Sequence, residues 1–398
     1  MVIGSRRYGS EGQALPLLVG GLVGLMMVVS LIVDGGNLWS QQRIVQNGAD
    51  AASEAGATVL AQRLSGNPTP AGGWDSAVSE AVSSSAGDNE IASFVGRYTD
   101  VCGQLLTSLD VPTTDVSTAA VVGSGMPPDL NTSIGCANNN PAGVAVVASK
   151  QVSTYIAGIV GIRTIPVGAG ATAVSGFYQG GCGAEAGEYC NVLPVTFPVA
   201  PIVCAGNGTP TFTGATTWPM NTQVILPLCN SANGDVGWLN WSPPSGGTQQ
   251  LEQSILTPNN PAITLPSWNW VPKTGEISSS QIQNALNTWK GKPVLVPLFD
   301  ATCSDTPTFG QVSQPSTFGC PAGSFNQGNG VNVWYRIPQF GAFVLTQAYT
   351  NGQNSPWCNG AKECLVGEFV KLISGGVVGP GVGGGSTQTS VVGVQLLK

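Results

Sequence analysis

The sequence contains no histidine in 398 residues, and only 9% of its residues are charged. The lack of histidine excludes Ser-His-Asp and Cys-His catalytic triads and histidine metal sites. Because an average soluble domain is ~25% charged, Ser, Thr, Asn, Gln and 55 glycines must supply the polar surface here, which suits a protein outside the cell. The net charge of -7 argues against a nucleic acid partner, since proteins that bind nucleic acids are usually basic. The hydrophobic fraction of 42% is enough for a folded core.

The sequence offers only weak candidates for phosphate, glycoside or calcium chemistry. The sequence has no Gly-x-x-x-x-Gly-Lys-Ser/Thr loop. Glu185 and Glu188 form a carboxylate pair in a Gly-rich loop, where two acids are more often solvated than catalytic. Asp300 and Asp305 offer oxygen ligands for Ca²⁺, but their spacing matches no EF-hand loop. We therefore expect no enzyme activity, no bound metal and no cofactor.

The chain is organised around a charge-free run from Gln13 to Val33. As a helix, this run is about 31 Å long, which matches the ~30 Å hydrocarbon core of a bilayer. Arg6 and Arg7 precede the run and Asp34 follows it, so the positive-inside rule predicts a cytoplasmic N-terminus and an extracytoplasmic remainder. A cleaved signal peptide is the alternative, but its apolar core is normally ~7–15 residues and ends in a small-residue cleavage site. The sequence therefore favours a retained membrane anchor.

All ten cysteines lie after the apolar run. An even number confined to the extracytoplasmic part predicts disulfides formed in an oxidising compartment. Zinc binding is the alternative, but Cys-x-x-Cys pairs and histidine are both absent. Nearest-neighbour pairing is the simplest connectivity, and it gives Cys102–Cys136, Cys182–Cys190, Cys204–Cys229, Cys303–Cys320 and Cys358–Cys364.

The segment after the run, Asn37 to Leu64, has helical periodicity and a stripe of small residues at Ala49, Ala52 and Gly56. If the membrane helix continues into it, the whole helix is about 78 Å long. Small residues allow another backbone to approach closely. Two partners for this face remain open: a helix of another protein, or residues 67–180 of the same chain.

Three stretches near the N-terminus resemble one known family: Glu-Gly-Gln-Ala-Leu-Pro at 11–16, Asp-Gly-Gly at 34–36, and the Ala-rich segment from Gln46 to Ala57. They are similar to the N-terminal domain of TadG-like proteins of Flp (Tad) pilus assembly. The resemblance implies a pilin-like membrane helix, an assembly role, and partners such as TadE-like pseudopilins or a second copy of the chain. Pilins and TadE-like proteins carry a Glu inside the apolar start, whereas Glu11 precedes it here. This departure fits TadG-like proteins, which resemble assembly factors that stay at the membrane.

Beyond the anchor, the sequence predicts an α+β fold in several parts. Apolar alternation and turn residues indicate strands at 94–98, 116–122, 144–147 and 163–177, and helices at 74–92 and 279–289. Residues 391–397 read either as a final strand or as part of a disordered tail. The predicted parts are 1–66, anchor and pilin-like helix with the transmembrane segment at about 13–33; 67–180, a small α+β domain; 181–374, a Cys-rich, mostly β domain; and 375–398, a Gly-rich tail.

Two further positions carry open alternatives. Asp34, at the expected membrane edge, either pairs with a neighbouring helix or is solvated. Trp268 and Trp270 alternate along one strand, where they either stack on sugars or a partner, or fill a β core. The leading hypothesis is a membrane-anchored structural component of a Tad-type pilus. The alternative is a membrane-tethered surface adhesin or carbohydrate-binding protein that uses the β domain.

Overall fold

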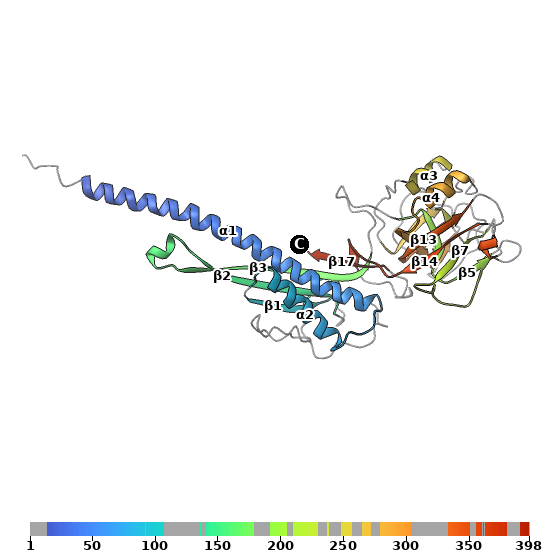
Figure 1. Ribbon diagram of the computed structural model, residues 1–398, viewed down its shortest axis with the longest axis horizontal. Helices are drawn as coiled ribbons and strands as arrows, with labels where there is room; N and C mark the ends of the chain where they lie inside the picture. Colours follow the sequence, from blue (N-terminus) through green and yellow to red (C-terminus); the bar gives the residue numbers. More distant parts are fainter. Residues whose placement is uncertain are drawn as a thin grey trace, which may run out of the picture.

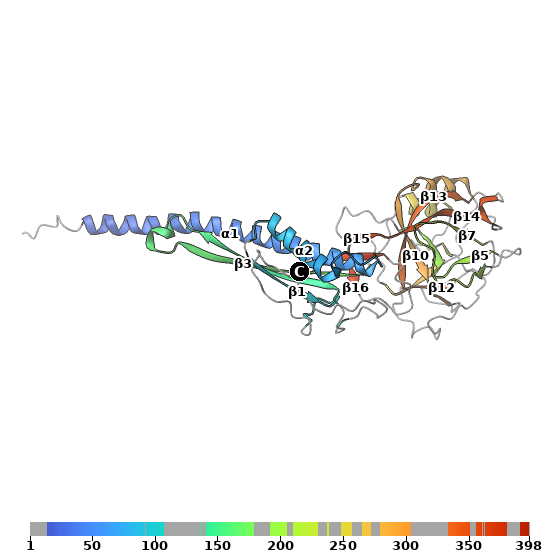
Figure 2. The same cartoon turned by 60° about the horizontal axis from the view of Figure 1, so that its bottom comes forward.

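The computed structural model is elongated, with helix α1 (Ala14–Leu64) projecting at one end and two folded units following it (Figure 1). The proximal unit packs on the C-terminal half of α1 and contains described residues of 34–178 and 373–397. The distal unit, within 192–370, lies beyond the end of that helix in both views (Figures 1 and 2). The described residues are 14–91, 93–106, 136, 141–178, 192–204, 210–229, 237–238, 248–256, 265–271, 279–303, 333–350, 356–359, 361, 363–379 and 391–397.

Helix α1 runs without interruption for 51 residues, so the apolar run and the Ala-rich segment form one rod. The helix ends at Leu64, because Gly66 adopts the left-handed conformation with φ of 70° that closes a helix C-terminus. The N–H of Gly66 donates to the carbonyl of Arg63 at 2.9 Å, and that of Asn67 donates to Gln62 at 3.1 Å. This pair of bonds is a Schellman motif.

The proximal unit is built on a sheet with the order β1-β2-β3-β17-β15, with β16 paired to β3. Neighbouring strands are antiparallel except for the parallel β15–β17 pair. Helix α1 packs across β2, β3 and β17, and α2 packs against α1. The elements are α2 (Gly73–Asp88), β1 (Ser93–Thr99), β2 (Gly143–Ser153), β3 (Thr164–Tyr178), β15 (Ile373–Gly375), β16 (Val378–Gly379) and β17 (Val392–Leu397). The strand expected at 116–122 lies outside the described residues.

Strands β2 and β3 form a long hairpin, paired from Gly143↔Val174 to Ser153↔Thr164. Its turn contains a short 3-10 helix, η1 (Ala157–Val160). The turn extends past the other strands and lies alongside α1 in both views, on the side toward the apolar half of that helix (Figures 1 and 2). We call residues 154–163 the hairpin tip.

The C-terminal residues return to the proximal unit and complete its sheet. Strand β17 pairs with β3 along its whole length, from Val392↔Phe177 to Leu397↔Thr172, and with β15 on its other side. The final strand is therefore present as β17, and the described residues within 375–398 that form strands belong to the proximal sheet. The distal unit is an insertion between β3 and β15, since both flanking elements belong to the proximal sheet.

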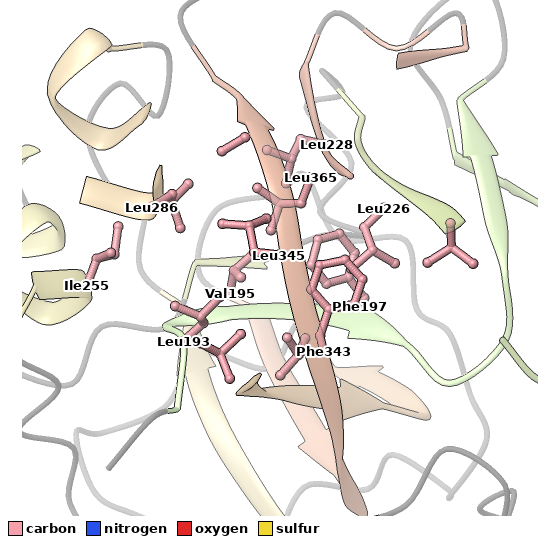
Figure 3. Packing of buried hydrophobic residues seen from close by; sticks show 14 of the residues in the cluster. Leu193, Val195, Phe197, Leu226, Leu228, Ile255, Leu286, Phe343, Leu345 and Leu365 are labelled. Atoms are coloured by element: carbon pink, nitrogen blue, oxygen red, sulfur yellow. The ribbon is translucent and has the colours of Figure 1, made fainter. Parts of the chain in front are cut away.

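The distal unit contains a six-stranded sheet with the order β7-β14-β13-β10-β4-β8, plus sheets β11-β12-β9 and β5-β6. Its main core lies between the large sheet and two helices, as Figure 3 shows for Val195, Leu286 and Leu345. The elements are β4 (Val195–Pro198), β5 (Ile202–Cys204), β6 (Pro210–Phe212), β7 (Gln223–Leu228), β8 (Gly237–Trp238), α3 (Thr248–Leu256), β9 (Ser267–Val271), α4 (Ser280–Asn287), β10 (Pro293–Phe299), β11 (Ala301–Cys303), β12 (Val333–Ile337), β13 (Gln339–Tyr349), η3 (Pro356–Cys358) and β14 (Glu363–Val370).

The helix expected at 279–289 is α4, which Ser279 caps by accepting the N–H of Ile282 at 3.2 Å. Helix α3 was not expected from the sequence. It is 9 residues long, and Leu251 and Ile255 are its buried side chains, one turn apart. So short an apolar signal among Pro- and Gly-rich segments does not stand out. The α+β fold class, with a mostly β distal unit, is confirmed.

Three disulfides lie in the described part of the chain, each with 5.4 Å between its Cα atoms. Their pairing follows the nearest-neighbour pattern, and none of the described cysteines is free. The three bonds are Cys102–Cys136, Cys204–Cys229 and Cys358–Cys364. Cys182, Cys190 and Cys320 lie outside the described residues, so the other two expected pairs stay predictions.

Candidate functional site

Among the described residues, no other element packs around α1 from Leu15 to Val33. Its large apolar side chains are exposed from Leu15 to Val33, with Leu31 76% exposed. In the described part of the chain, α1 is the helix that is long and apolar enough to cross a membrane. An exposed apolar surface of this size is expected to contact something other than water. As a helix, the apolar run is about as long as the ~30 Å hydrocarbon core of a bilayer is thick, so lipid is the environment that suits these side chains.

Asp34 stands where the bare half of α1 ends, and it binds the hairpin tip of its own chain. Its carboxylate accepts the backbone N–H groups of Tyr155 at 2.7 Å and Ala157 at 2.7 Å, and that of Ile156 at 3.1 Å. The Ser30 hydroxyl donates to the same carboxylate at 3.3 Å. Although this contact buries Asp34, its hydrogen bonds, first that from Ala157, hold the pKa of the carboxyl below its usual range.

The two alternatives left open for Asp34 thus give way to a third. In the described part of the chain the side chain is neither solvated nor paired with another α-helix, because three N–H groups of a loop 121 to 123 residues away bind it. These donors are free at the start of a short helical turn, where an anionic acceptor is favourable. Backbone donors leave no signature in side-chain types, so sequence patterns give no sign of this contact.

Replacing Asp34 by asparagine is expected to loosen the hairpin tip. The carboxamide keeps one acceptor oxygen but loses the charge and presents an NH₂ group to backbone donors. Hydrogen exchange of the full chain in detergent should become faster in a peptide that covers residues 154–163. Because the pKa of Asp34 is lowered in the folded protein, the contact should persist as pH falls to the ordinary Asp range and weaken only at more acidic pH.

The matched control for this variant is Asp50→Asn on the same helix. Asp50 accepts a hydrogen bond from Gln46 Nε2 at 2.7 Å, within α1, and makes none to the tip. Exchange of the tip should be unchanged in this control. Equal exchange in Asp34→Asn and the parent protein would show that the three N–H bonds do not hold the tip.

The small residues of α1 lie in the core of the proximal unit. Ala49 and Ala52 are fully buried among side chains of α2, β1 and β2. A Cβ on Gly56 would approach Val82 Cγ2 to 2.8 Å and Val144 Cγ2 to 2.9 Å. Of the two partners left open for this face, the structure places the chain's own residues against it. A pseudopilin helix has no access to this face while the proximal unit is folded.

The Ala-rich motif is further tied to the sheet by Gln46. Its Nε2 donates to the carbonyl of Gly170 in β3 at 3.2 Å as well as to Asp50. At the other end of α1, Tyr98 in β1 donates its hydroxyl to Asp75 in α2 at 2.9 Å, near the buried Arg63. Burial raises the pKa of Asp75 against the opposing effects of Tyr98 and Arg63. These polar contacts hold α1 and α2 on the strands.

Of the four acids considered for chemistry, the structure describes one, Asp300. Asp300 is paired with Arg336 at 2.6 Å, and burial raises the pKa of this carboxyl despite its cationic partner. Asp305, Glu185 and Glu188 lie outside the described residues. Among the described residues, no group of three His, Cys, Asp or Glu side chains is placed to hold a metal ion.

Of the two tryptophans considered as a binding surface, the structure describes the side chain of one, Trp268. Trp268 is buried in the distal unit, with 1% of its surface exposed, so it does not form a platform for a sugar. The side chain of Trp270 lies outside the described part. Of the predicted pair, the described member is a core residue.

This geometry defines a class of protein in which one N-terminal helix is bare and apolar in its first half and forms the core of a folded unit in its second. Residues 12–59, which include the bare half and most of the buried half of this helix, match a family model described as putative Flp pilus-assembly TadE/G-like. The resemblance of the N-terminal part to TadG-like proteins is thereby confirmed, and it supports a role related to Flp pilus assembly. Comparison with curated proteins and with solved structures gave no match.

Proposed function

We propose that the protein is a single-pass, membrane-anchored component of Flp pilus assembly, with its N-terminus in the cytoplasm and both folded units outside. The observation that carries this proposal is the division of α1 at Asp34. Before this residue the apolar side chains are exposed, and after it Ala49, Ala52 and their neighbours are core. Such a helix fixes the proximal unit directly above the bilayer, without a linker.

The proposed role is structural and not catalytic. Asp34 is buried and Asp75 and Asp300 are partly buried, and each makes an internal contact, to the hairpin tip, Tyr98 and Arg336 respectively. Each therefore has an architectural use. The absence of histidine from the sequence supports the same conclusion.

TadE-like pseudopilins, or a second copy of the chain, are the partners that this role implies. Since the small-residue face of α1 is internal, such a partner would bind another surface. The distal unit lies farthest from the bare end of α1 (Figure 1). With the anchor in the membrane, it is the unit best placed to meet a growing fibre.

The test combines topology with piliation in the organism that encodes the chain. A reporter active only outside the cytoplasm, fused after Leu64, should be active, and a reporter active only inside should not. The intact protein should stay in the membrane fraction after alkaline extraction, and deletion of the gene should abolish Flp pili. The opposite reporter pattern would refute the orientation. Normal pili in the deletion strain would refute the assembly role.

A further inference from the structure

The hairpin tip is an exposed apolar element. From Thr154 to Ile162 it contains no charged residue, and its sequence is Thr-Tyr-Ile-Ala-Gly-Ile-Val-Gly-Ile. Tyr155, Ile159 and Ile162 are 69%, 78% and 53% exposed. Large apolar side chains gathered at the end of a hairpin are expected to contact something other than water.

The position of the tip indicates what that contact is. Its backbone is bound to Asp34, the first residue after the bare apolar run of α1. The turn lies alongside α1 and points toward the helix end that carries this run (Figures 1 and 2). Leu31 and Ile32, which lie within the turn that precedes Asp34, are themselves 76% and 68% exposed. The tip and the start of the run thus form neighbouring apolar surfaces.

Two exposed aromatic side chains lie near Asp34, where the bare apolar run of α1 ends. Tyr155 is at the tip, and Trp39 is exposed on α1 shortly after Asp34, with the Arg43 guanidinium 4.0 Å from its ring centroid. Tyr and Trp concentrate where hydrocarbon meets water, because each has an apolar ring and a polar atom. Both residues therefore fit the boundary of a bilayer.

The backbone of the tip is also suited to a water-poor surface, where each unsatisfied N–H or C=O group costs several kcal/mol. Asp34 accepts the N–H groups of residues 155–157. Further along, Ile162 N–H donates to Ala157 at 3.1 Å, and Gly161 N–H to Gly158 at 3.2 Å. The Thr154 hydroxyl donates to the carbonyl of Ile162. These internal bonds lower the cost of removing the tip from water.

We propose that the hairpin tip inserts the side chains of Tyr155, Ile159 and Ile162 into the outer leaflet of the membrane that α1 crosses. This inference rests on the membrane anchorage proposed above. Lipid is favoured over a protein partner because the tip is continuous with a surface that the bilayer already covers. The protein would then have two membrane contacts, which fix its tilt and rotation in a way that a single helix does not.

The test places an environment-sensitive fluorescent amino acid at one position of the full chain, reconstituted in phosphatidylcholine–phosphatidylglycerol vesicles. The vesicles carry a nitroxide quencher near the lipid head groups. The probe replaces Ile159 at the tip, Leu31 in the apolar run, or Val147. Val147 is the matched control, since it is 60% exposed on β2 of the same hairpin but lies away from the tip.

The probes at positions 159 and 31 should lose most of their emission to the nitroxide, and the probe at 147 should keep it. Iodide in the water should quench position 159 several-fold less than position 147. Quenching by lipid at 31 without quenching at 159 would overturn the tip insertion and leave the anchor standing. Quenching at neither position would overturn both. If the tip is shielded from iodide in native membranes but not quenched in vesicles, it meets a protein partner and the lipid contact is refuted.

Discussion

Replacement of Gly56 by leucine is expected to unfold the proximal unit. A Cβ at this position would already lie 2.8 Å from Val82 and 2.9 Å from Val144, and leucine adds three more carbons. Both valines are β-branched and stiff, so they cannot move aside easily. Overpacking of a core typically costs about 1–3 kcal/mol, and we expect the upper end of this range or more. Protease resistance and thermal unfolding of the full chain in detergent would measure the loss.

Gly36→Leu is the matched control, because it makes the same substitution in the same helix. A Cβ at Gly36 meets nothing within 4 Å, so this variant should be as protease-resistant as the parent. Pili should be lost in Gly56→Leu as a consequence of unfolding. If pili disappear while the proximal unit stays resistant, Gly56 acts through a partner and its internal packing is not the cause.

The parts of the fold that the sequence predicted are those with local signals. The segment from Asn37 to Leu64 has a helical repeat, and α1 ends at Leu64, the last residue of that segment. The strand expected at 163–177 is observed as Thr164–Tyr178. Alternation, capping and turn residues act over a few positions, and they can be read without knowing the tertiary structure.

The features that could not be predicted from the sequence depend on contacts between residues that lie far apart in the chain. Asp34 meets Tyr155 across 121 residues, and its partners there are backbone groups that any residue has. The small residues of α1 correctly predicted that another element packs closely against this face of the helix. They did not indicate whether that element belongs to the same chain. In the structure Val82 and Val144 are that neighbour. A face of small residues shows that a closely packed neighbour fits there, but it does not identify which surface that neighbour is.

The position of β17 could not be predicted for the same reason. Residues 391–397 carry a strand-like pattern, but nothing local indicates that β3 is the partner or that the distal unit is an insertion. Boundaries drawn from composition follow the chain in order. Such boundaries cannot show that the last strand of the chain pairs with a sheet formed by much earlier residues.

Deletion of residues 391–398 is therefore expected to destabilise the proximal unit strongly. It removes the central pairing of β3 with β17, and it exposes the core around Ala61, Leu64 and Val101, which the buried Val392 covers. Loss of a buried valine alone costs about 1.5–3 kcal/mol. A domain's net stability is only about 5–15 kcal/mol, so loss of the whole strand should bring the unit close to unfolding.

The variant Val392→Ala tests the same contact without shortening the chain, and removal of Lys398 alone is the control for a changed terminus. We expect the thermal midpoint of the full chain in detergent to fall in the order parent, Val392→Ala, then the deletion. Removal of Lys398 should leave it unchanged, because β17 ends at Leu397. Limited proteolysis should then cut α1 after Asp34 in the deletion variant, where the parent is protected by its own sheet. An unaltered midpoint and cleavage pattern would mean that residues 391–397 are a dispensable tail and that β3 needs no partner on that side.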